Sequence, residues 1–210
     1  VMYRAGDTEG APWSTAPEYQ VLDDDRHADG KKPETSAAAC YALYPAAGKT
    51  LVPVGEWNEG RLVIRDGVVE HWLNGVRVVQ YEWRGAAFRE LVAKSKFKDM
   101  KSFASLDKGR IALQDHGDAV WYRHLRIREF APQSRVALFD GKSLAGWTHH
   151  LVSGKAEDVW SVTPEGVLVC QGNPVGYLRT GKDYKNFSLH GEWRVSPVTK
   201  REGNSGVLFR

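Results

Sequence analysis

The chain has little cysteine and no long apolar run. Its 210 residues include two cysteines, Cys40 and Cys170, which are too few for a disulfide framework or a cysteine-based zinc site. No apolar stretch approaches the ~18 residues that a membrane-spanning helix needs, and the longest candidate is the alanine-rich segment 37–43. We therefore expect no membrane span.

A dominant charge sign is also missing. Lys and Arg number 29 against 26 Asp and Glu, so the formal net charge is only +3. This balance does not provide the basic field that binding to a phosphate backbone requires, so nucleic acid is not an expected partner. The sequence also has no Walker loop, dinucleotide fingerprint, nucleophile elbow or His-Glu-x-x-His string. Neither a nucleotide cofactor nor serine-type acyl transfer is expected.

What the chain does have is many apolar residues that alternate with polar ones along the sequence. Hydrophobic residues make up 42% and aromatic residues 11%, which is enough for one large core or two small ones. In segment 187–195, Phe187, Leu189 and Trp193 alternate with polar residues, as in a half-buried antiparallel strand. Asn74-Gly75 joins the β-branched runs 67–73 and 76–82, and this dipeptide is a strong signal for a hairpin turn.

The same alternation predicts an all-β fold. Beside the strands already named, we expect strands at 18–23, 39–43, 61–65, 110–114, 119–129, 159–162, 166–170 and 176–180. One short helix is expected near 85–95, where Phe88, Leu91 and Val92 share a face. More than ten short strands and a single helix predict an antiparallel jelly-roll sandwich.

Segment 131–137 has no periodicity and is the expected linker between residues 1–130 and 138–210. Residues 1–4 (VMYR) and 207–210 (VLFR) share one pattern, which suggests one period of a longer repeat. We expect the strand at 187–195 to join the same sandwich as those at 18–23 and 61–82. The two matching ends should then compete for one position in a sheet.

Several longer strings carry a resemblance to a known family. They are 138–144 (LFDGKSL), 184–187 (YKNF), 204–207 (NSGV), 17–24 (PEYQVLDD), 70–75 (EHWLNG) and 113–117 (LQDHG). Over nearly its whole length the chain resembles the 3-keto-disaccharide hydrolase family, which has the concanavalin A-like lectin/glucanase fold. The half that opens the family domain follows the closing half here, which fits either an excerpt from a tandem protein or a circular permutant.

The resemblance implies cleavage of glycosides oxidised at C3, with a periplasmic or extracellular location. A C3 ketone acidifies the hydrogen on C2, so a general base can start expulsion of the glycosidic oxygen, with hydrolysis as the net outcome. Two non-enzymatic alternatives stay open, because fold alone does not decide function. The chain could be a carbohydrate-binding module or a structural repeat of a multidomain surface protein.

The candidate site residues follow from strand faces and from the family strings. Glu18 and Gln20 share a strand face within the most distinctive string, and Glu18 or His71 is the expected catalytic base. A concave sheet could turn such a polar face into a sugar-sized groove, although a solvated face would show the same pattern. The residues expected to contact substrate are Arg4, Gln20, Trp57, Asn58, His116, Glu192, Asn204 and Arg210.

A divalent metal is a further possibility at residues 23–27 (DDDRH). Carboxylate oxygens suit hard cations and imidazole suits zinc-type ions, so Asp24 and His27 are the candidate ligands. The alternative is an acidic turn stabilised by Asx hydrogen bonds, since the spacing does not match an EF-hand loop.

Overall fold

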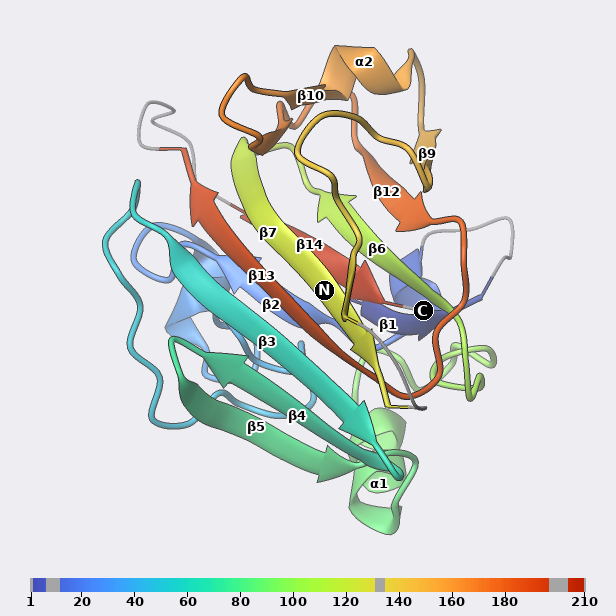
Figure 1. The fold of residues 1–210 in the computed structure, drawn as a ribbon. Coiled ribbons are helices and arrows are strands. Elements are labelled where there is room, and N and C mark those ends of the chain that lie inside the picture. The colour runs from blue at the N-terminus through green and yellow to red at the C-terminus, as the bar shows by residue number, and fades with distance from the viewer. Residues whose placement is uncertain (1, 7–11, 131–134, 197–203, 210) are drawn as a thin grey trace.

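The strands of the computed structural model form two antiparallel sheets that pack face to face (Figure 1). The structure describes residues 2–6, 12–130, 135–196 and 204–209. Within them, sheet A has the strand order β2-β14-β6-β12-β9, with β1 also paired to β6. Its strands are β1 (Met2–Ala5), β2 (Tyr19–Leu22), β6 (Arg110–Asp115), β9 (Trp147–Leu151), β12 (Gly176–Thr180) and β14 (Asn204–Phe209).

Sheet B has the order β10-β11-β7-β13-β3-β4-β5, with β8 also paired to β7. Its strands are β3 (Asn58–Arg65), β4 (Val68–Leu73), β5 (Val76–Glu82), β7 (Val120–Glu129), β8 (Arg135–Ala137), β10 (Trp160–Val162), β11 (Leu168–Cys170) and β13 (Phe187–Val195). This architecture confirms the predicted all-β sandwich.

Among the residues that the structure describes, helical structure is limited to short pieces. They are η1 (Pro12–Ser14), η2 (Ala28–Lys31), α1 (Ala86–Lys94) and α2 (Ala156–Val159). The helix α1 begins and ends within the predicted segment, and its buried Phe88 stacks on Tyr81 with ring centroids 5.3 Å apart. In the described part of the chain, no helix is long and apolar enough to cross a membrane.

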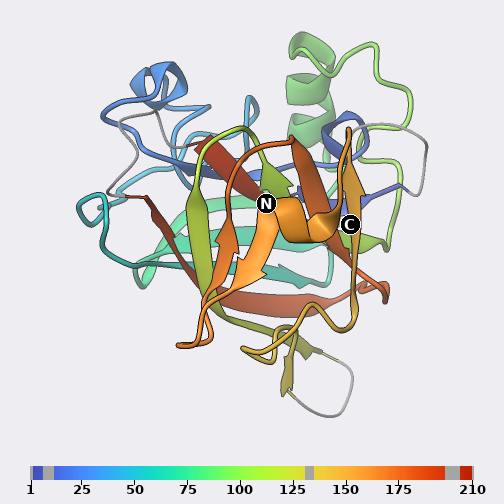
Figure 2. The ribbon, with the colours of Figure 1, turned by 90° about the horizontal axis from the view of Figure 1, so that it is seen from above.

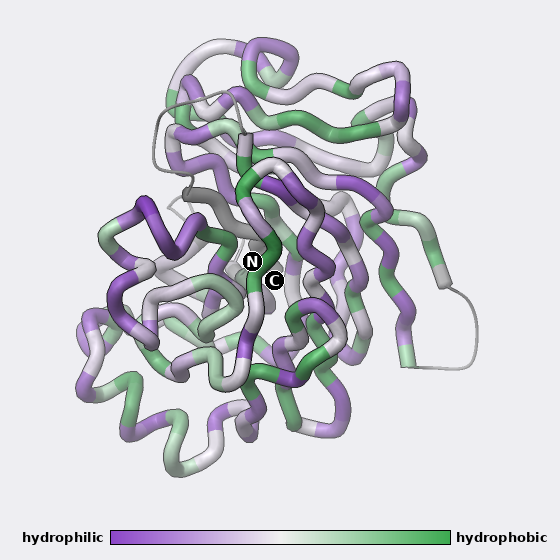
Figure 3. The backbone as a smooth tube through the Cα atoms, turned by 90° about the vertical axis from the view of Figure 1, so that its left-hand side faces the viewer, coloured by the Kyte–Doolittle hydropathy of each residue, from purple (hydrophilic) through white to green (hydrophobic). Residues whose placement is uncertain are grey.

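The core lies between the sheets, where the inward members of each alternating strand meet. Leu62 and Ile64 of β3 and Phe187 and Leu189 of β13 are all buried there. Figure 3 shows the corresponding changes of hydropathy along the chain. Since apolar area removed from water is the main stabilising contribution, period-two alternation holds the two layers together.

The two parts of the chain on either side of segment 131–137 share this core. The strand β13 lies between β3 and β7, so that Leu189 is in register with both Leu62 and Ile127. Likewise β14 lies between β2 and β6. The predicted hydrogen-bonded ladders between early and late strands are therefore present, and the halves do not form separate cores.

The matching patterns at the two ends fall on the same part of β6. Met2 of β1 and Leu208 of β14 are both registered with Ala112, and Tyr3 and Phe209 are both registered with Ile111. The expected competition for one position in sheet A is thus visible in the pairing. Displacement of one of the two segments stays a prediction.

Two expectations about local structure were wrong. Segment 39–43 forms turns with isolated bridges rather than a strand, because Ala38 and Ala42 adopt positive φ angles that interrupt an extended chain. The C-terminal part of the expected linker forms β8, whose Val136 pairs with Ile127. The strand β9 was missed because most of its side chains are exposed, so it lacks the apolar alternation on which the prediction relied.

Candidate active site

A pocket of about 380 Å³ lies on the outer face of sheet A, a size typical of small-ligand sites. Tyr19 and Val21 of β2 face the core, so the alternation directs Glu18 and Gln20 outward. Both line the pocket, as the shared-face interpretation predicted. The full lining consists of Trp13, Ala16, Glu18, Gln20, Asp29, Tyr41, Lys96, Phe97, Gln114, Asp115, His116 and Val175.

The loop after β2 folds back and covers the free edge of that strand. Gln20 donates its backbone N–H to the carbonyl of Ala39 at 3.1 Å, and Tyr41 donates to the carbonyl of Glu18 at 3.0 Å. Cys40 between them points into the core, while the Tyr41 hydroxyl donates to Asp29 Oδ2 at 3.0 Å. In Figure 2 this blue loop and α1 lie on the side of the molecule opposite β13. The cover therefore turns an open sheet face into a pocket.

Glu18 has the electrostatic environment of a general base. Its side chain is only 8% exposed, and this burial raises the pKa of its carboxyl above the ordinary value. Lys96 and His116 act to lower this pKa without cancelling the shift, and Asp29 adds to the shift. A carboxylate with a raised pKa is a stronger base near neutral pH than an exposed one.

Lys96 is one of several pocket residues that sequence reasoning missed, together with Asp29, Tyr41 and Gln114. Its ammonium lies 4.2 Å from the centre of the Tyr41 ring, a cation–π contact. Burial lowers the pKa of Lys96, while Glu18 and Asp29 act to raise it. Segment 94–101 is rich in lysine and has the composition of a solvated surface, so no sequence signal distinguished this lysine from its neighbours.

The floor of the pocket continues across three strands of sheet A. Gly206 of β14 is in register with Gln20 of β2 on one side and with Gln114 of β6 on the other. Both amides line the pocket, as does His116 just beyond β6. Asn204 pairs through its backbone with Leu22 two positions further along, whereas its side chain and Arg210 lie outside the described residues.

His71 does not reach this pocket, so its expected role as a catalytic base is not supported by its position. The ring is fully buried between the sheets, with Nδ1 2.9 Å from the carbonyl of Ala38 and Nε2 3.2 Å from the hydroxyl of Tyr3. Burial lowers the pKa of His71 to about 3. A neutral imidazole with both nitrogens engaged bridges the layers instead.

Arg4 and Asn58 also lie outside the pocket lining. Arg4 is buried, and its guanidinium stacks 4.4 Å from the centre of the Trp83 ring. The Asn58 Oδ1 accepts hydrogen bonds from the backbone N–H of Val52 at 3.1 Å and from Asn74 Nδ2 at 2.9 Å. These contacts give Asn58 a role in holding the hairpin and the preceding loop.

Trp57 and Glu192 belong to sheet B and its border. The Trp57 ring has Arg123 at 4.2 Å and Arg194 at 4.6 Å from its centre, which leaves little of its face for a sugar. Glu192 on β13 forms ion pairs with Arg123 and with His124. These two predicted substrate contacts are therefore placed away from Glu18, and the alternation of β13 could not tell the two outer faces apart.

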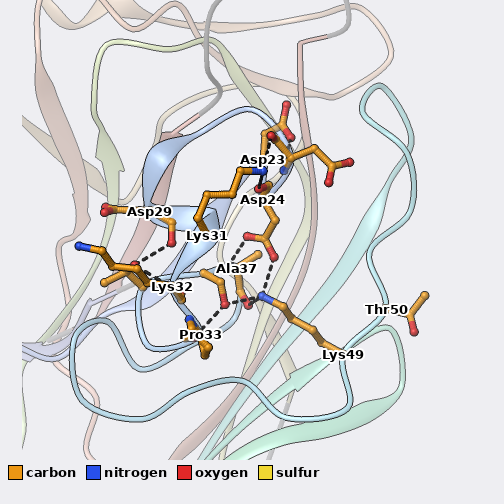
Figure 4. A network of polar contacts seen from close by, with 12 residues as sticks. Asp23, Asp24, Asp29, Lys31, Lys32, Pro33, Ala37, Lys49 and Thr50 are labelled. Carbon is orange, nitrogen blue, oxygen red and sulfur yellow. Dashed lines mark hydrogen bonds and ion pairs between the residues drawn. The ribbon is translucent and has the colours of Figure 1, made fainter.

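The residues expected to hold a metal are engaged by other groups, and Figure 4 shows Asp24 beside Lys49 and Ala37. Asp24 Oδ2 pairs with Lys49 Nζ at 2.6 Å, and Oδ1 accepts the N–H of Ala37 at 2.7 Å. His27 Nδ1 accepts the N–H of Asp29 at 3.0 Å and caps η2. Among the described residues, no three His, Cys, Asp or Glu side chains gather as metal ligands would. The donor set matches the acidic-turn alternative better than a metal site.

Comparisons with known proteins agree with the resemblance in the sequence. Residues 1–128 and 134–210 match the family described as 3-keto-alpha-glucoside-1,2-lyase-like domain. The chain belongs to this family. It is also 36% identical over 127 residues to a protein of Bacteroides thetaiotaomicron named 3-keto-disaccharide hydrolase. That match covers 54% of this chain and 44% of the relative, so the chain matches less than half of the relative's length.

A structural relative comes from Parabacteroides distasonis, where a crystal structure is provisionally assigned as a glycosyl hydrolase. It aligns with a TM-score of 0.45 and 16% sequence identity, covering 93% of this chain and 64% of that one.

Proposed function

We propose that this chain cleaves 3-keto-glycosides in the pocket on sheet A, with Glu18 as the general base. The observation that carries the proposal is the placement of Glu18: a buried carboxylate with a raised pKa lines a pocket that also contains Lys96 and His116. The family match and the name of the curated relative support the substrate class.

The reaction follows from the acidity of a carbon beside a ketone. Glu18 removes the proton from C2, and the electron pair forms an enolate whose charge on the C3 oxygen is stabilised by Lys96. The enolate then re-forms the ketone and a C1–C2 double bond while the C1–O bond breaks, and His116 protonates the departing oxygen. Water adds to C1 and gives one proton back to His116, while Glu18 returns the proton to C2, which gives net hydrolysis. Gln20 and Gln114 orient the sugar hydroxyls.

A non-catalytic carbohydrate-binding module would have a different pocket. Such a site needs aromatic platforms and amides, but it does not need titratable side chains that face one another. Here the aromatic ring of Tyr41 is engaged by Lys96, Glu18 and Lys96 act on each other's pKa values, and the charge of Asp29 acts on both. This arrangement favours catalysis over binding alone.

The decisive experiment compares a 3-keto-glucoside with the parent glucoside in ²H₂O. We expect aglycone release from the 3-keto substrate alone, with solvent deuterium at C2 of the released 3-keto sugar. Because the hydrogen on C2 also exchanges slowly without enzyme, the free product is incubated in parallel to subtract that background. Equal release from both glucosides, or release with no enzyme-dependent deuterium at C2, would contradict the base-initiated route.

Two variants connect the reaction to the pocket. Glu18→Gln should slow both release and exchange by about 10³-fold, since the amide cannot accept the C2 proton. Glu34→Gln makes the same chemical change on the exposed part of the loop, and it should behave like the unmodified chain. If both variants keep full activity, the site lies elsewhere.

A further inference from the structure

The outer face of sheet B carries a second groove that the proposed reaction does not use. It measures about 830 Å³ and crosses β3, β4, β5, β7 and β13, on the opposite layer from the Glu18 pocket. Four arginines line it against two carboxylates, Asp66 and Glu70. The arginines are Arg61, Arg65, Arg126 and Arg128. This local excess of positive charge contrasts with the near-balance of the whole chain.

Three basic side chains lie directly opposite one another in this groove. His190 of β13 is in register with Arg61 of β3 on one side and with Arg126 of β7 on the other. The two guanidinium groups on either side of His190 are always charged, and like charges held close together in a sheet destabilise it. Glu59 compensates only in part, through an ion pair with His190 at 3.2 Å. Arg61 and Arg126 form no ion pair with a carboxylate of any described residue. The positive charges of Arg61 and Arg126 are therefore available to bind an anionic ligand.

Aromatic rings hold three of the guanidinium groups in place. Arg61 lies 4.0 Å from the centre of the Trp72 ring, and Arg65 and Arg128 each lie 5.3 Å from that of Phe130. A stacked guanidinium keeps its N–H edge available, and that planar fork matches a carboxylate. The same stacking occupies the rings, so they cannot serve as platforms for nucleobases, which single-stranded nucleic acid would need.

The next row of the sheet offers groups suited to hydroxyls. Ser188, Glu70 and Gln80 all line the groove, and Glu70 is in register with Gln80. Glu70 is held by the indole N–H of Trp72 at 2.9 Å and by Arg77 at 3.0 Å. A fixed carboxylate repels a densely charged polyanion but accepts hydrogen bonds from sugar hydroxyls. The groove thus pairs a row for acidic groups with a row for hydroxyls.

We propose that this groove binds a carboxylate-bearing polysaccharide, a chain of uronic acid residues. The arginine row would contact the carboxylates, and Ser188, Gln80 and Glu70 would contact the hydroxyls. The site is independent of the reaction proposed for the Glu18 pocket. It gives the domain an attachment to acidic glycan on one face while the other face stays open to small 3-keto-glycosides.

Titration calorimetry with a defined oligogalacturonate tests the proposal. We expect saturable binding that is lost when the carboxylates are methyl-esterified, and a double variant Arg61→Gln/Arg126→Gln that binds at least tenfold more weakly. Arg89→Gln, which removes an exposed arginine of α1, is the matched control and should bind normally. Oligothymidylate and dextran sulfate are run in parallel.

The possible outcomes separate the alternatives. No binding of oligogalacturonate, binding unchanged in the double variant, or equally tight binding of dextran sulfate or oligothymidylate would overturn the proposal. A double variant Arg61→Lys/Arg126→Lys covers the case of misfolding, since it keeps the charge and should bind with intermediate strength. Cleavage of a small 3-keto-glucoside should be unchanged in all these variants, so loss of the groove is distinguishable from failure of the proposed reaction.

Discussion

The outer faces of the two sheets carry the same type of residue in opposite electrostatic states. Glu18 on sheet A lies beneath a loop cover, and burial raises its pKa. Glu192 on sheet B is less covered; burial acts to raise its pKa, but hydrogen bonds from His124 and Arg123 outweigh that effect and lower it. Alternation gives each sheet a polar outer face, whereas reactivity depends on what covers that face.

The largest effect is expected when the carboxylate of Glu18 itself is removed. Glu18→Gln should lower kcat/KM for a 3-keto-glucoside by about 10³-fold, within the range of general-base contributions. Glu192→Gln makes the same change on the other sheet and should lower it less than threefold. Steady-state kinetics on both variants provide the measurement. A similar loss in both would mean that the two faces do not differ in function.

The same pair also differs in the pH dependence of stability. Because the folded state raises the pKa of Glu18, ionisation opposes folding as the pH rises from the ordinary glutamate value through the raised one. Glu18→Gln removes this effect, so its thermal midpoint relative to the unmodified chain should increase between pH 4 and pH 7. Glu192, with a lowered pKa, should give the opposite trend. Differential scanning calorimetry at both pH values can separate the two.

The next effect concerns His71, which is buried between the two sheets. His71→Ala should lower the free energy of unfolding by about 3 kcal/mol, since it leaves a cavity and removes the hydrogen bond to the carbonyl of Ala38. With a folded pKa of about 3, neutral His71 contributes stability that is lost as the pH falls from about 6.5 towards 3. Urea unfolding at pH 7 and pH 5 should therefore show a smaller difference at pH 5. A variant that is as stable as the unmodified chain but inactive would restore His71 as a catalytic candidate.

A smaller effect is expected for Lys96, which acts on the pKa of Glu18. Lys96→Met keeps an apolar stem beside Tyr41 and removes the positive charge near Glu18. We expect a 10- to 100-fold lower kcat/KM, together with a shift of the acidic limb of the pH–rate profile to higher pH. The matched control is Lys98→Met, which is exposed nearby. An unchanged profile in Lys96→Met would remove Lys96 from the site.

The smallest effect is expected in the loop beside the pocket. Asp24→Ala breaks the ion pair with Lys49 and should cost about 1 kcal/mol of unfolding free energy. Activity should be nearly unchanged, and a chelator should have no effect on the unmodified chain. Activity that is lost on chelation and absent from Asp24→Ala would instead establish a metal at this position.

The sequence by itself determined the alternation of apolar and polar residues and the strand features that depend on it. The Asn74-Gly75 hairpin, the strand at 187–195 and the shared face of Glu18 and Gln20 all follow from local geometry, because successive strand residues point to opposite faces. The inward position of His71 was also encoded, since it shares its strand parity with Val69 and Leu73, which are both fully buried. The family strings also identified the family, which the family match over residues 1–128 and 134–210 confirms.

Only the tertiary structure decided which polar face became a pocket. Nothing local to Lys96 distinguishes it from Lys94 or Lys98; it acquires its role because the segment after α1 approaches β2, nearly eighty residues earlier in the chain. Asp24 has the right chemistry for a metal, but its carboxylate oxygens are engaged by Lys49 and by the backbone N–H of Ala37. Burial and long-range partners set the charge state of a side chain, and neither is contained in the spacing of residues along the chain.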